Sequence, residues 1–373
     1  MGEALELARR LVRIDTRGGG ERRAADLVAD VLDGAGFAVR VDEPAEGRAN
    51  VVARHGPEAA RVPVTFTGHL DTVPADASGW SFDPLSGDVR DGRLLGRGSS
   101  DMKAGVACQV EAAVRAVRDG LPAPQLVFTF GEETGCDGAA ALDPAALAAT
   151  DLLIVAEPTG NRTVLGHKGT LWLKATARGV SAHGSRPELG RNALAALAAA
   201  AVRVHGHAGW PVSPTHGPAT VNVGTFHSGV QPNLVPDRAE MRLDVRTVPG
   251  FGADEAVAVI SELCGGEVEL ERLVDLPGVA TDPAAPGMPE VLELLAPGSS
   301  GAAPEYATYF TDASVLAGLL GGPDVVIYGP GDPEQAHVTD ETCSVARVDA
   351  AAEALHRLLA ARRPGGAGED HRP

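Results

Sequence analysis

The segment GHLDTVP, residues 68–74, places a histidine and an acid directly after an apolar run. Residues two apart in an extended chain point to the same side, so the side chains of His69 and Asp71 should lie together. A carboxylate that accepts one ring N–H of a histidine leaves the other ring nitrogen free for a metal ion. The pair therefore suits a metal ligand and the acid that orients it, although a polar turn after a strand has the same composition.

Two further apolar runs end in acids. Glu132 and Glu133 follow the run at 126–130, and Glu157 follows the run at 151–156. Adjacent acids point in different directions, so one can bind a metal while the other moves a proton. Glu157 taken alone is equally consistent with an exposed acid at the end of a strand.

Asp101 and His337 complete the set of candidate ligands. Asp101 stands in the glycine-rich segment GRGSSDMKAG, residues 96–105, where a helix is predicted to begin. Aspartate is also a common N-cap residue, so this position has a purely structural explanation as well. His337 follows an apolar run at 324–328 and a loop rich in Gly and Pro, where an ordinary loop histidine would look the same.

Taken together, the five segments supply two histidines and five carboxylates. In open α/β sheets, sites gather at the carboxyl ends of the strands, which is where these residues are predicted to lie. Mixed nitrogen and oxygen ligands suit zinc, cobalt or manganese, and a carboxylate shared by two ions lets them act on one water molecule. Serine-nucleophile and phosphate-loop chemistries are disfavoured, because no G-x-S-x-G sequence precedes a helix and residues 96–98 match neither G-x-x-x-x-G-K-[S/T] nor G-x-G-x-x-G.

The spacing of apolar residues predicts the elements that position these groups. Alternating helical and extended segments before residue 168 indicate an α/β sheet covered on both faces. The next segments follow the order strand, helix, strand, strand, helix, strand, which is typical of a ferredoxin-like α+β unit. A Pro/Gly-rich stretch at 277–287 then returns the chain to the α/β pattern. We therefore expect a catalytic domain of residues 1–168 and 282–364, interrupted by a smaller domain at 169–281, and a disordered tail at 365–373.

Composition excludes several classes of protein. The 373 residues include 32 Lys+Arg and 50 Asp+Glu, and the formal net charge is −18, so binding to nucleic acid or to an anionic membrane surface is not expected. No apolar run is long enough to span a membrane, and the N-terminus lacks the uninterrupted apolar segment of a signal peptide. The four cysteines are far apart, which argues against a disulfide framework and favours a cytoplasmic protein with reduced thiols.

The motifs GHLDTVP, GRGSSDMKAG, GEET and AEPT, followed by His337, resemble in order and spacing those of the M20 family of dizinc aminoacylases and exopeptidases. That family includes acetylornithine deacetylase, succinyl-diaminopimelate desuccinylase and glutamate carboxypeptidase. The resemblance covers nearly the whole chain and omits only the tail. It implies a zinc-exopeptidase-like catalytic domain with a mixed sheet, interrupted by a ferredoxin-like domain that acts as lid and dimerisation surface.

The resemblance also implies a metal site with two Zn²⁺ ions, for which Co²⁺ or Mn²⁺ can substitute. His69 and Glu157 would be terminal ligands of one ion. Glu133 and His337 would be terminal ligands of the other, and Asp101 would bridge the two. No ligand position of the family is missing from this chain.

The remaining catalytic roles are implied in the same way. Asp71 would orient His69, and Glu132 would be the general base on the water that bridges the two zinc ions. In this family the bridging aspartate typically precedes a cis peptide bond, here Asp101–Met102.

Three residues of the inserted domain are assigned by the same resemblance. His183, in GVSAHG, resembles the lid histidine that reaches a partner subunit's active site and stabilises the oxyanion of the tetrahedral intermediate. Asn233 resembles a substrate contact, and Arg246 resembles an arginine that binds the substrate carboxylate in a bidentate fork. Each of the three also has a structural explanation: His183 as a histidine in a surface turn, Asn233 as a loop amide, and Arg246 as an arginine at the end of a strand.

The expected function is removal of an acyl group from an N-acyl amino acid, by a homodimer that acts on small molecules. The alternative is a metal-dependent carboxypeptidase or dipeptidase with the same metals and base, because only the specificity pocket would differ. The sequence GHKG at 166–169 resembles the deacylase side of the family. A non-catalytic binding protein on the same scaffold is a third possibility, against which the presence of Glu132 argues.

Overall fold

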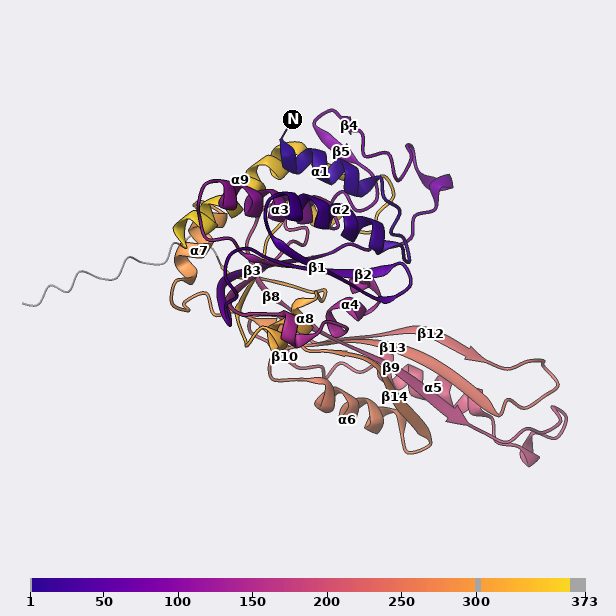
Figure 1. The fold of residues 1–373 in the computed structure, drawn as a ribbon. Helices are drawn as coiled ribbons and strands as arrows, with labels where there is room; N and C mark the ends of the chain where they lie inside the picture. Colours follow the sequence, from indigo (N-terminus) through magenta and orange to yellow (C-terminus); the bar gives the residue numbers. More distant parts are fainter. Residues whose placement is uncertain (1, 299–302, 363–373) are drawn as a thin grey trace, which may run out of the picture. The chain divides into compact units, whose positions relative to one another are not determined.

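The computed structural model describes residues 2–298 and 303–362 and divides into two compact units (Figure 1). The first unit comprises Met1–Leu165, Thr281–Glu305 and Thr311–Pro373, and the second comprises Gly166–Ala280 and Tyr306–Phe310. The tail predicted at 365–373 lies outside the described residues. Among the helices that the structure describes, none combines the length and the apolarity needed to cross a membrane.

The first unit is built on a mixed sheet whose central strands are parallel. In spatial order these are β6 (Gln125–Thr129), β3 (Arg61–His69), β7 (Ala149–Val155) and β17 (Asp324–Ile327). Their buried residues form nearly continuous apolar runs, as expected for strands covered on both faces. Antiparallel strands extend the sheet on both sides: β2 (Arg48–Arg54) and β1 (Ala38–Ala45) beyond β6, and β8 (Val164–His167) beside β17.

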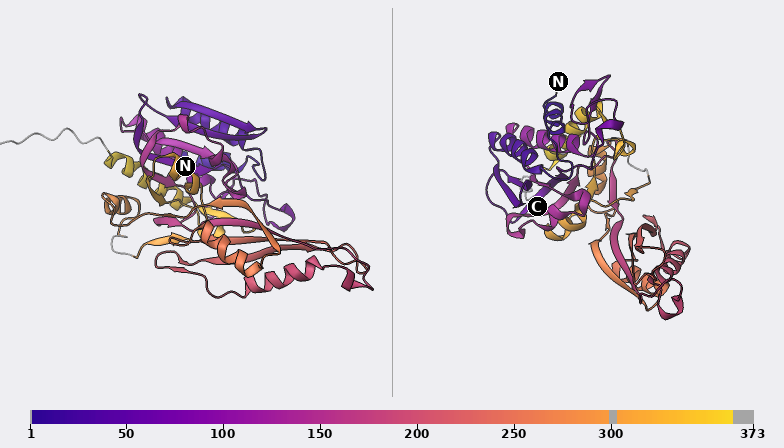
Figure 2. Two further views of the ribbon diagram at one scale, coloured as in Figure 1. Left: turned by 90° about the horizontal axis from the view of Figure 1, so that it is seen from below. Right: turned by 90° about the vertical axis from the view of Figure 1, so that its right-hand side faces the viewer.

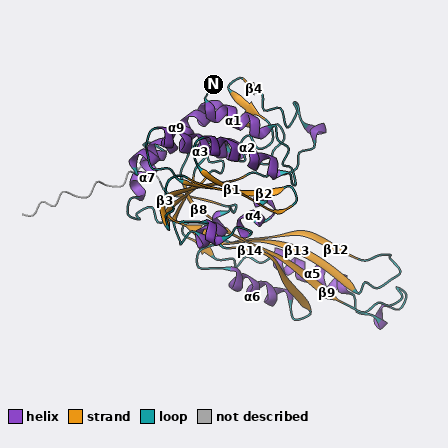
Figure 3. Cartoon of the chain, viewed as in Figure 1, coloured by secondary structure: helices purple, strands orange, loops and turns teal. Residues whose placement is uncertain are grey.

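Helices of the first unit cover both faces of this sheet (Figures 1 and 3). One face carries α1 (Glu3–Val12), α2 (Glu21–Gly34), α3 (Lys103–Arg118) and α9 (Val345–Ala361), and α7 (Met288–Leu295) packs on α9. The other face carries α4 (Asp137–Ala140) and α8 (Ala313–Leu319). Helix α3 lies very close to the end of β7: a Cβ at Gly105 would lie 2.2 Å from the carbonyl oxygen of Ala156. Only glycine allows this approach, which sets the start of α3 beside the end of β7.

A small three-stranded sheet in the first unit was not predicted. It consists of β4 (Val89–Arg90), β5 (Arg93–Leu95) and β18 (Thr342–Ser344), in the order β18-β5-β4. These strands of two or three residues are too short to show a hydrophobic period in the sequence. Their pairing places the segment after His337 beside the segment that leads to Asp101.

The second unit is a four-stranded antiparallel sheet with two helices (Figure 2). Along the chain its elements are β9 (Gly169–Arg178), α5 (Ala193–His205), β12 (Thr220–Ser228), β13 (Arg238–Thr247), α6 (Ala253–Cys264) and β14 (Val268–Leu276). The spatial strand order is β12-β13-β9-β14, so the predicted ferredoxin-like order of elements is observed. Alternate residues of β9 and β13, such as Leu173 and Leu243, form the core with the apolar faces of both helices.

The shortest elements of the second unit were also missed. They are β10 (Val212–Ser213), β11 (Gly217–Pro218), β15 (Val279–Ala280) and β16 (Glu305–Ala307). β15 lies inside the stretch interpreted as a return linker, where it pairs with Gly166 and His167. The segment Tyr306–Phe310 joins this unit through ring contacts of Tyr306 with His216 and of Phe310 with Trp172.

Candidate metal centre

The parallel strands of the first unit deliver the candidate ligands to one edge of the sheet. His69 is the last residue of β3, Glu132 and Glu133 begin the short turn of helix after β6, and Glu157 follows β7. Because β6, β3 and β7 are neighbours and run parallel, their carboxyl ends lie together. The backbone thus brings a histidine and three acids from separate parts of the sequence to the same place.

Asp71 holds both His69 and the turn that carries the two glutamates. His69 Nδ1 lies 3.0 Å from the backbone oxygen of Asp71 and 3.5 Å from its carboxylate. The same carboxylate accepts hydrogen bonds from the backbone N–H groups of Glu132, at 3.2 Å, and Glu133, at 3.1 Å. Asp71 therefore fixes the histidine ring with Nε2 pointing away from it, and fixes the backbone of both acids.

Asp101 lies between two histidines. One of its carboxylate oxygens is 3.3 Å from Nε2 of His69, and the other is 3.4 Å from Nε2 of His337. The Asp101–Met102 peptide bond is cis, as the resemblance implied. Each carboxylate oxygen thus faces a different imidazole nitrogen, an arrangement that suits a carboxylate shared by two metal ions.

Glu133 and His337 form the second half of the cluster. The two oxygens of Glu133 lie 3.0 and 3.1 Å from Nε2 of His337. Ligand atoms of His69, Asp101 and Glu133 all lie within 4.8 Å of one another. His337 comes from the loop after β17, so the fourth parallel strand of the central set also contributes to the site.

The carboxyl groups of this cluster are buried and close to one another, which favours the binding of cations. Glu132 and Glu157 are only 5% and 4% exposed. Burial raises the pKa of both, and negative neighbours add to the effect: Glu157 and Glu133 for Glu132, and Asp101 for Glu157. Such crowding of buried carboxyl groups is relieved when positive ions bind among them.

The pKa values of both histidines are raised beside these carboxyl groups. Burial disfavours the charged form of His69, but hydrogen bonds to Asp101 and Asp71 outweigh it and raise its pKa. Hydrogen bonds to Asp101 and Glu133 raise the pKa of His337 to about 10. Both Nε2 atoms face carboxylates, so the donor set of imidazole nitrogens and carboxylate oxygens fits zinc or a similar divalent ion.

One acidic residue of this region was not identified from the sequence. Asp312 is buried at the start of α8, accepts a hydrogen bond from the Thr129 hydroxyl, and has its pKa raised to about 6 by burial. It adds a sixth carboxyl group to the neighbourhood of His69 and Asp71. No apolar run with strand character ends at this residue, so the signal that pointed to the other acids was absent.

The second unit holds the other three candidates, and it brings only two of them together. The backbone N–H of Gly184, next to His183, donates to the oxygen of Asn233 at 2.8 Å. His183 is exposed, and its Nδ1 lies 2.7 Å from the Ser185 hydroxyl. Arg246 lies at the far end of β13, a strand of ten residues that spans roughly 30 Å.

Arg246 is held in a defined orientation. Its guanidinium forms an ion pair with Asp244 at 2.9 Å, donates to the Thr170 hydroxyl at 2.7 Å, and lies over the ring of Phe310. Burial lowers the pKa of Lys168, and the positive charge of the nearby Arg246 lowers it further. This end of the second unit therefore carries two neighbouring cations.

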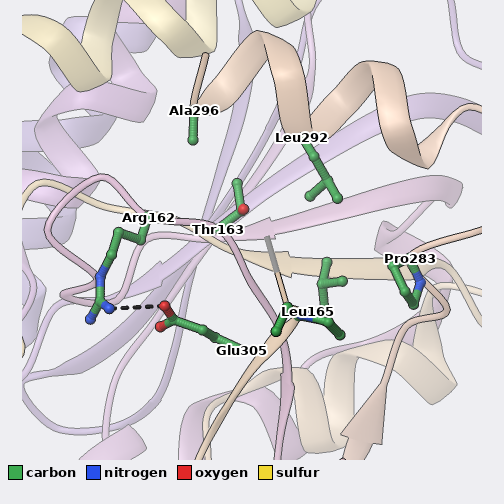
Figure 4. A pocket seen from close by; sticks show the side chains of 9 residues that line it. Arg162, Thr163, Leu165, Pro283, Leu292, Ala296 and Glu305 are labelled. Carbon is green, nitrogen blue, oxygen red and sulfur yellow. Dashed lines mark hydrogen bonds and ion pairs between the residues drawn. The ribbon is translucent and has the colours of Figure 1, made fainter. Parts of the chain in front are cut away.

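A separate cavity of about 170 Å³ in the first unit has a different character (Figure 4). Leu165, Leu292 and Pro283 supply much of its apolar lining. Its one carboxylate, Glu305, pairs with Arg162 at 2.9 Å. The described residues that line this cavity include neither histidine nor cysteine, the usual nitrogen and sulfur ligands of zinc.

Comparisons with known proteins point to one family of hydrolases. The family model described as peptidase family M20/M25/M40 matches residues 65–361. A probable carboxypeptidase of Aspergillus clavatus is 33% identical, over 96% of this chain and 82% of its own length. An acetylornithine deacetylase of Aliivibrio salmonicida is 28% identical over 91% of each chain. The crystal structure of an M20 family metallo-carboxypeptidase from Sulfolobus solfataricus superposes with a TM-score of 0.78 at 19% identity, covering 96% of this chain and 99% of that one, and so shares the fold.

Proposed function

The chain belongs to peptidase family M20/M25/M40, a family of metal-dependent hydrolases of amide bonds, and from that premise we propose that it removes the acyl group from an N-acyl amino acid. The observation that carries the proposal is the position of Asp101, whose two oxygens face the two histidines. A site for two ions suits amide hydrolysis, because an amide carbonyl is a poor electrophile that needs strong polarisation.

The ligand set divides into two groups around Asp101. His69 and Glu157 would hold one Zn²⁺, and Glu133 and His337 the other, with Co²⁺ or Mn²⁺ as substitutes. When bound, the two ions would polarise the substrate carbonyl and lower the pKa of the attacking water. Asp71 keeps the His69 ring in place through its contacts at Nδ1.

Glu132 is the general base of the proposed reaction. It takes a proton from the attacking water as the new C–O bond forms, and it gives that proton to the amide nitrogen as the C–N bond breaks. Its backbone N–H is bonded to Asp71, which fixes the start of the side chain, and its burial keeps bulk water away from the carboxyl group. No covalent intermediate between enzyme and substrate is required.

The amine side of the substrate would be recognised through its carboxylate. Arg246 and the neighbouring Lys168 would provide the positive charge for this contact. Asn233 lies beside His183 at the other end of the sheet, so it would contact the amide from a second copy of the chain. An N-acyl amino acid and the C-terminal end of a peptide both carry a carboxylate next to the scissile amide. A carboxypeptidase or dipeptidase activity is therefore the second candidate, and the 33% identity to a probable carboxypeptidase favours it.

A substrate panel tests the proposal and separates the two candidates. The metal-free protein should be inactive, and addition of Zn²⁺ or Co²⁺ should restore hydrolysis of N-acetyl or N-succinyl amino acids, measured by release of the free amine. Removal of the ions with a chelator should abolish the activity again, because the water then loses its activation. Cleavage of dipeptides alone would support the second candidate, and metal-independent cleavage would contradict both.

His183 is proposed to act in the active site of a second copy. His183 and Arg246 lie at opposite ends of one sheet, further apart than the length of an N-acyl amino acid, so one chain cannot place both on the same small substrate unless that sheet rearranges. The same sheet has β12 as an edge strand, and α5 exposes Val202 to 72%. An unpaired edge and an exposed apolar side chain suit a homodimer interface on this unit, which would also serve as the lid.

Mixing two inactive variants tests this arrangement. His183→Ala should lower kcat by about two to three orders of magnitude, because it removes a donor to the oxyanion. After unfolding and refolding with an equal amount of Glu132→Gln, random dimers should recover about a quarter of the wild-type activity, since half the dimers then hold one complete site. If mixed dimers are shown to form and no activity is recovered, His183 acts within its own chain.

The four cysteines, Cys108, Cys136, Cys264 and Cys343, are buried and unbridged. Free thiols are typical of reducing compartments, which supports the proposal that the protein works in the cytoplasm.

A further inference from the structure

Glu341 is a fully buried carboxylate that the proposed reaction does not use. It lies four residues after His337, next to β18. One of its oxygens accepts hydrogen bonds from the Arg97 guanidinium at 2.7 Å and from the Gly98 backbone at 3.0 Å. The other accepts from the backbone N–H groups of Ser100 at 2.7 Å and Asp101 at 3.0 Å.

Three of these four donors belong to the backbone that leads into Asp101. The N–H groups of Gly98, Ser100 and Asp101 converge on a single carboxylate. The loop is therefore an anion-binding concavity filled by a side chain of the protein itself. Gly98 has a φ of +83°, a conformation that L side chains rarely adopt, and a Cβ there would lie 2.7 Å from Thr72. The loop is therefore shaped by its glycine and held in that shape by Glu341.

The same contacts join the two segments that supply Asp101 and His337. The Gly96 backbone N–H donates to the backbone oxygen of Glu341 at 3.0 Å, and the Ser100 hydroxyl donates to the oxygen of Thr342 at 2.9 Å. Asp101 and His337 are far apart in sequence, so their 3.4 Å approach depends on this junction. The buried Glu341 side chain lies at its centre.

We propose that Glu341 is a positioning residue that sets Asp101 at the spacing from His337 needed to hold two metal ions. The inference rests on the proposed role of Asp101 as the shared ligand. A carboxylate is required because all four hydrogen-bond partners of Glu341 are donors. A glutamine of the same size would direct its NH₂ group at either the Ser100 and Asp101 N–H groups or those of Arg97 and Gly98, and the loop would have to move.

The test measures metal binding directly. Metal-free Glu341→Gln should keep its far-UV circular dichroism and bind Co²⁺ or Zn²⁺ about 10- to 100-fold more weakly than the wild type in a calorimetric titration. The visible absorption of the dicobalt form should change as well, because it reports the ligand geometry. Glu334→Gln, the same substitution at an exposed position before His337, is the matched control and should bind both ions normally.

A purely structural role gives a different result. In that case Glu341→Gln would lower the melting temperature of the metal-free protein but leave the metal affinity and the cobalt spectrum of the folded protein unchanged, which would overturn the proposal. If Glu341→Gln does not fold, Glu341→Asp serves instead, with weaker metal binding expected and unchanged affinity as the contrary result. Because the readout is metal binding, a wild-type protein that binds two ions but cleaves no N-acyl amino acid would refute the proposed activity and leave this inference standing.

Discussion

Replacing Glu132 with glutamine should lower kcat by about two to four orders of magnitude while leaving two metal ions bound per chain. The amide has nearly the same size as the carboxyl group but cannot accept the proton of the attacking water. The backbone N–H of residue 132 still donates to Asp71, so the turn keeps its position. The loss should therefore fall on kcat, measured under saturating substrate and metal, with a much smaller change in KM.

The neighbouring glutamate provides the contrast. Glu133→Gln removes a carboxylate that faces His337 at 3.0 Å, so it should lower the metal content, measured by elemental analysis after dialysis. Two adjacent substitutions of the same kind would then separate proton transfer from metal binding. A Glu132→Gln enzyme that is fully active with its metal bound would show that the base is another group.

The parallel strands and the residues at their ends could be predicted because both signals are local. A buried strand such as β6 or β7 is a short apolar run, and the polar residue that ends it is next to it in the sequence. Parallel neighbours then bring those ends together without any further information. The positions of His69, Glu132 and Glu157 at one edge of the sheet follow from this rule.

Asp101 shows where local signals leave two explanations open. Its place at the start of α3 is equally typical of an N-cap aspartate. In the structure the N-cap of α3 is Met102 and no side chain caps the helix, while the Asp101 carboxylate turns to His69 and His337. The choice is made by contacts with residues far away in sequence, which a local pattern cannot contain.

Glu341 could not be found from the sequence for the same reason. Its partners at 97–101 are more than 200 residues away, and the strands beside it, β5 and β18, are too short to have a hydrophobic period. Neither the residue before it nor the one after it marks it as different from a surface acid. Only the folded chain shows that four hydrogen-bond donors converge on it.

Replacing Asp101 with asparagine should reduce the metal content from two ions per chain to one or none, and the activity by at least about three orders of magnitude. The carbonyl oxygen of asparagine can still bind one ion, but its NH₂ group cannot bind the other, so the shared ligand is lost. If the second ion supplies about 4 kcal/mol of transition-state stabilisation, its loss costs about a thousandfold in rate. Metal analysis and single-turnover rates on the same preparation would measure both effects.

Asp143→Asn is the control for the alternative that Asp101 is only an N-cap residue of a helix. Asp143 is a true cap, because its side chain accepts a hydrogen bond from the Ala145 backbone N–H at 3.0 Å. Asparagine is also a good cap residue, so the stability of this variant should change by only a few tenths of a kcal/mol and its metal content not at all. If Asp101→Asn behaved like Asp143→Asn, with both ions retained and hydrolysis at the wild-type rate, Asp101 would be a helix-end residue and the metal centre would have to lie elsewhere. Loss of metal from Asp101→Asn alone would instead tie the binding of both ions to the carboxylate that faces the two histidines.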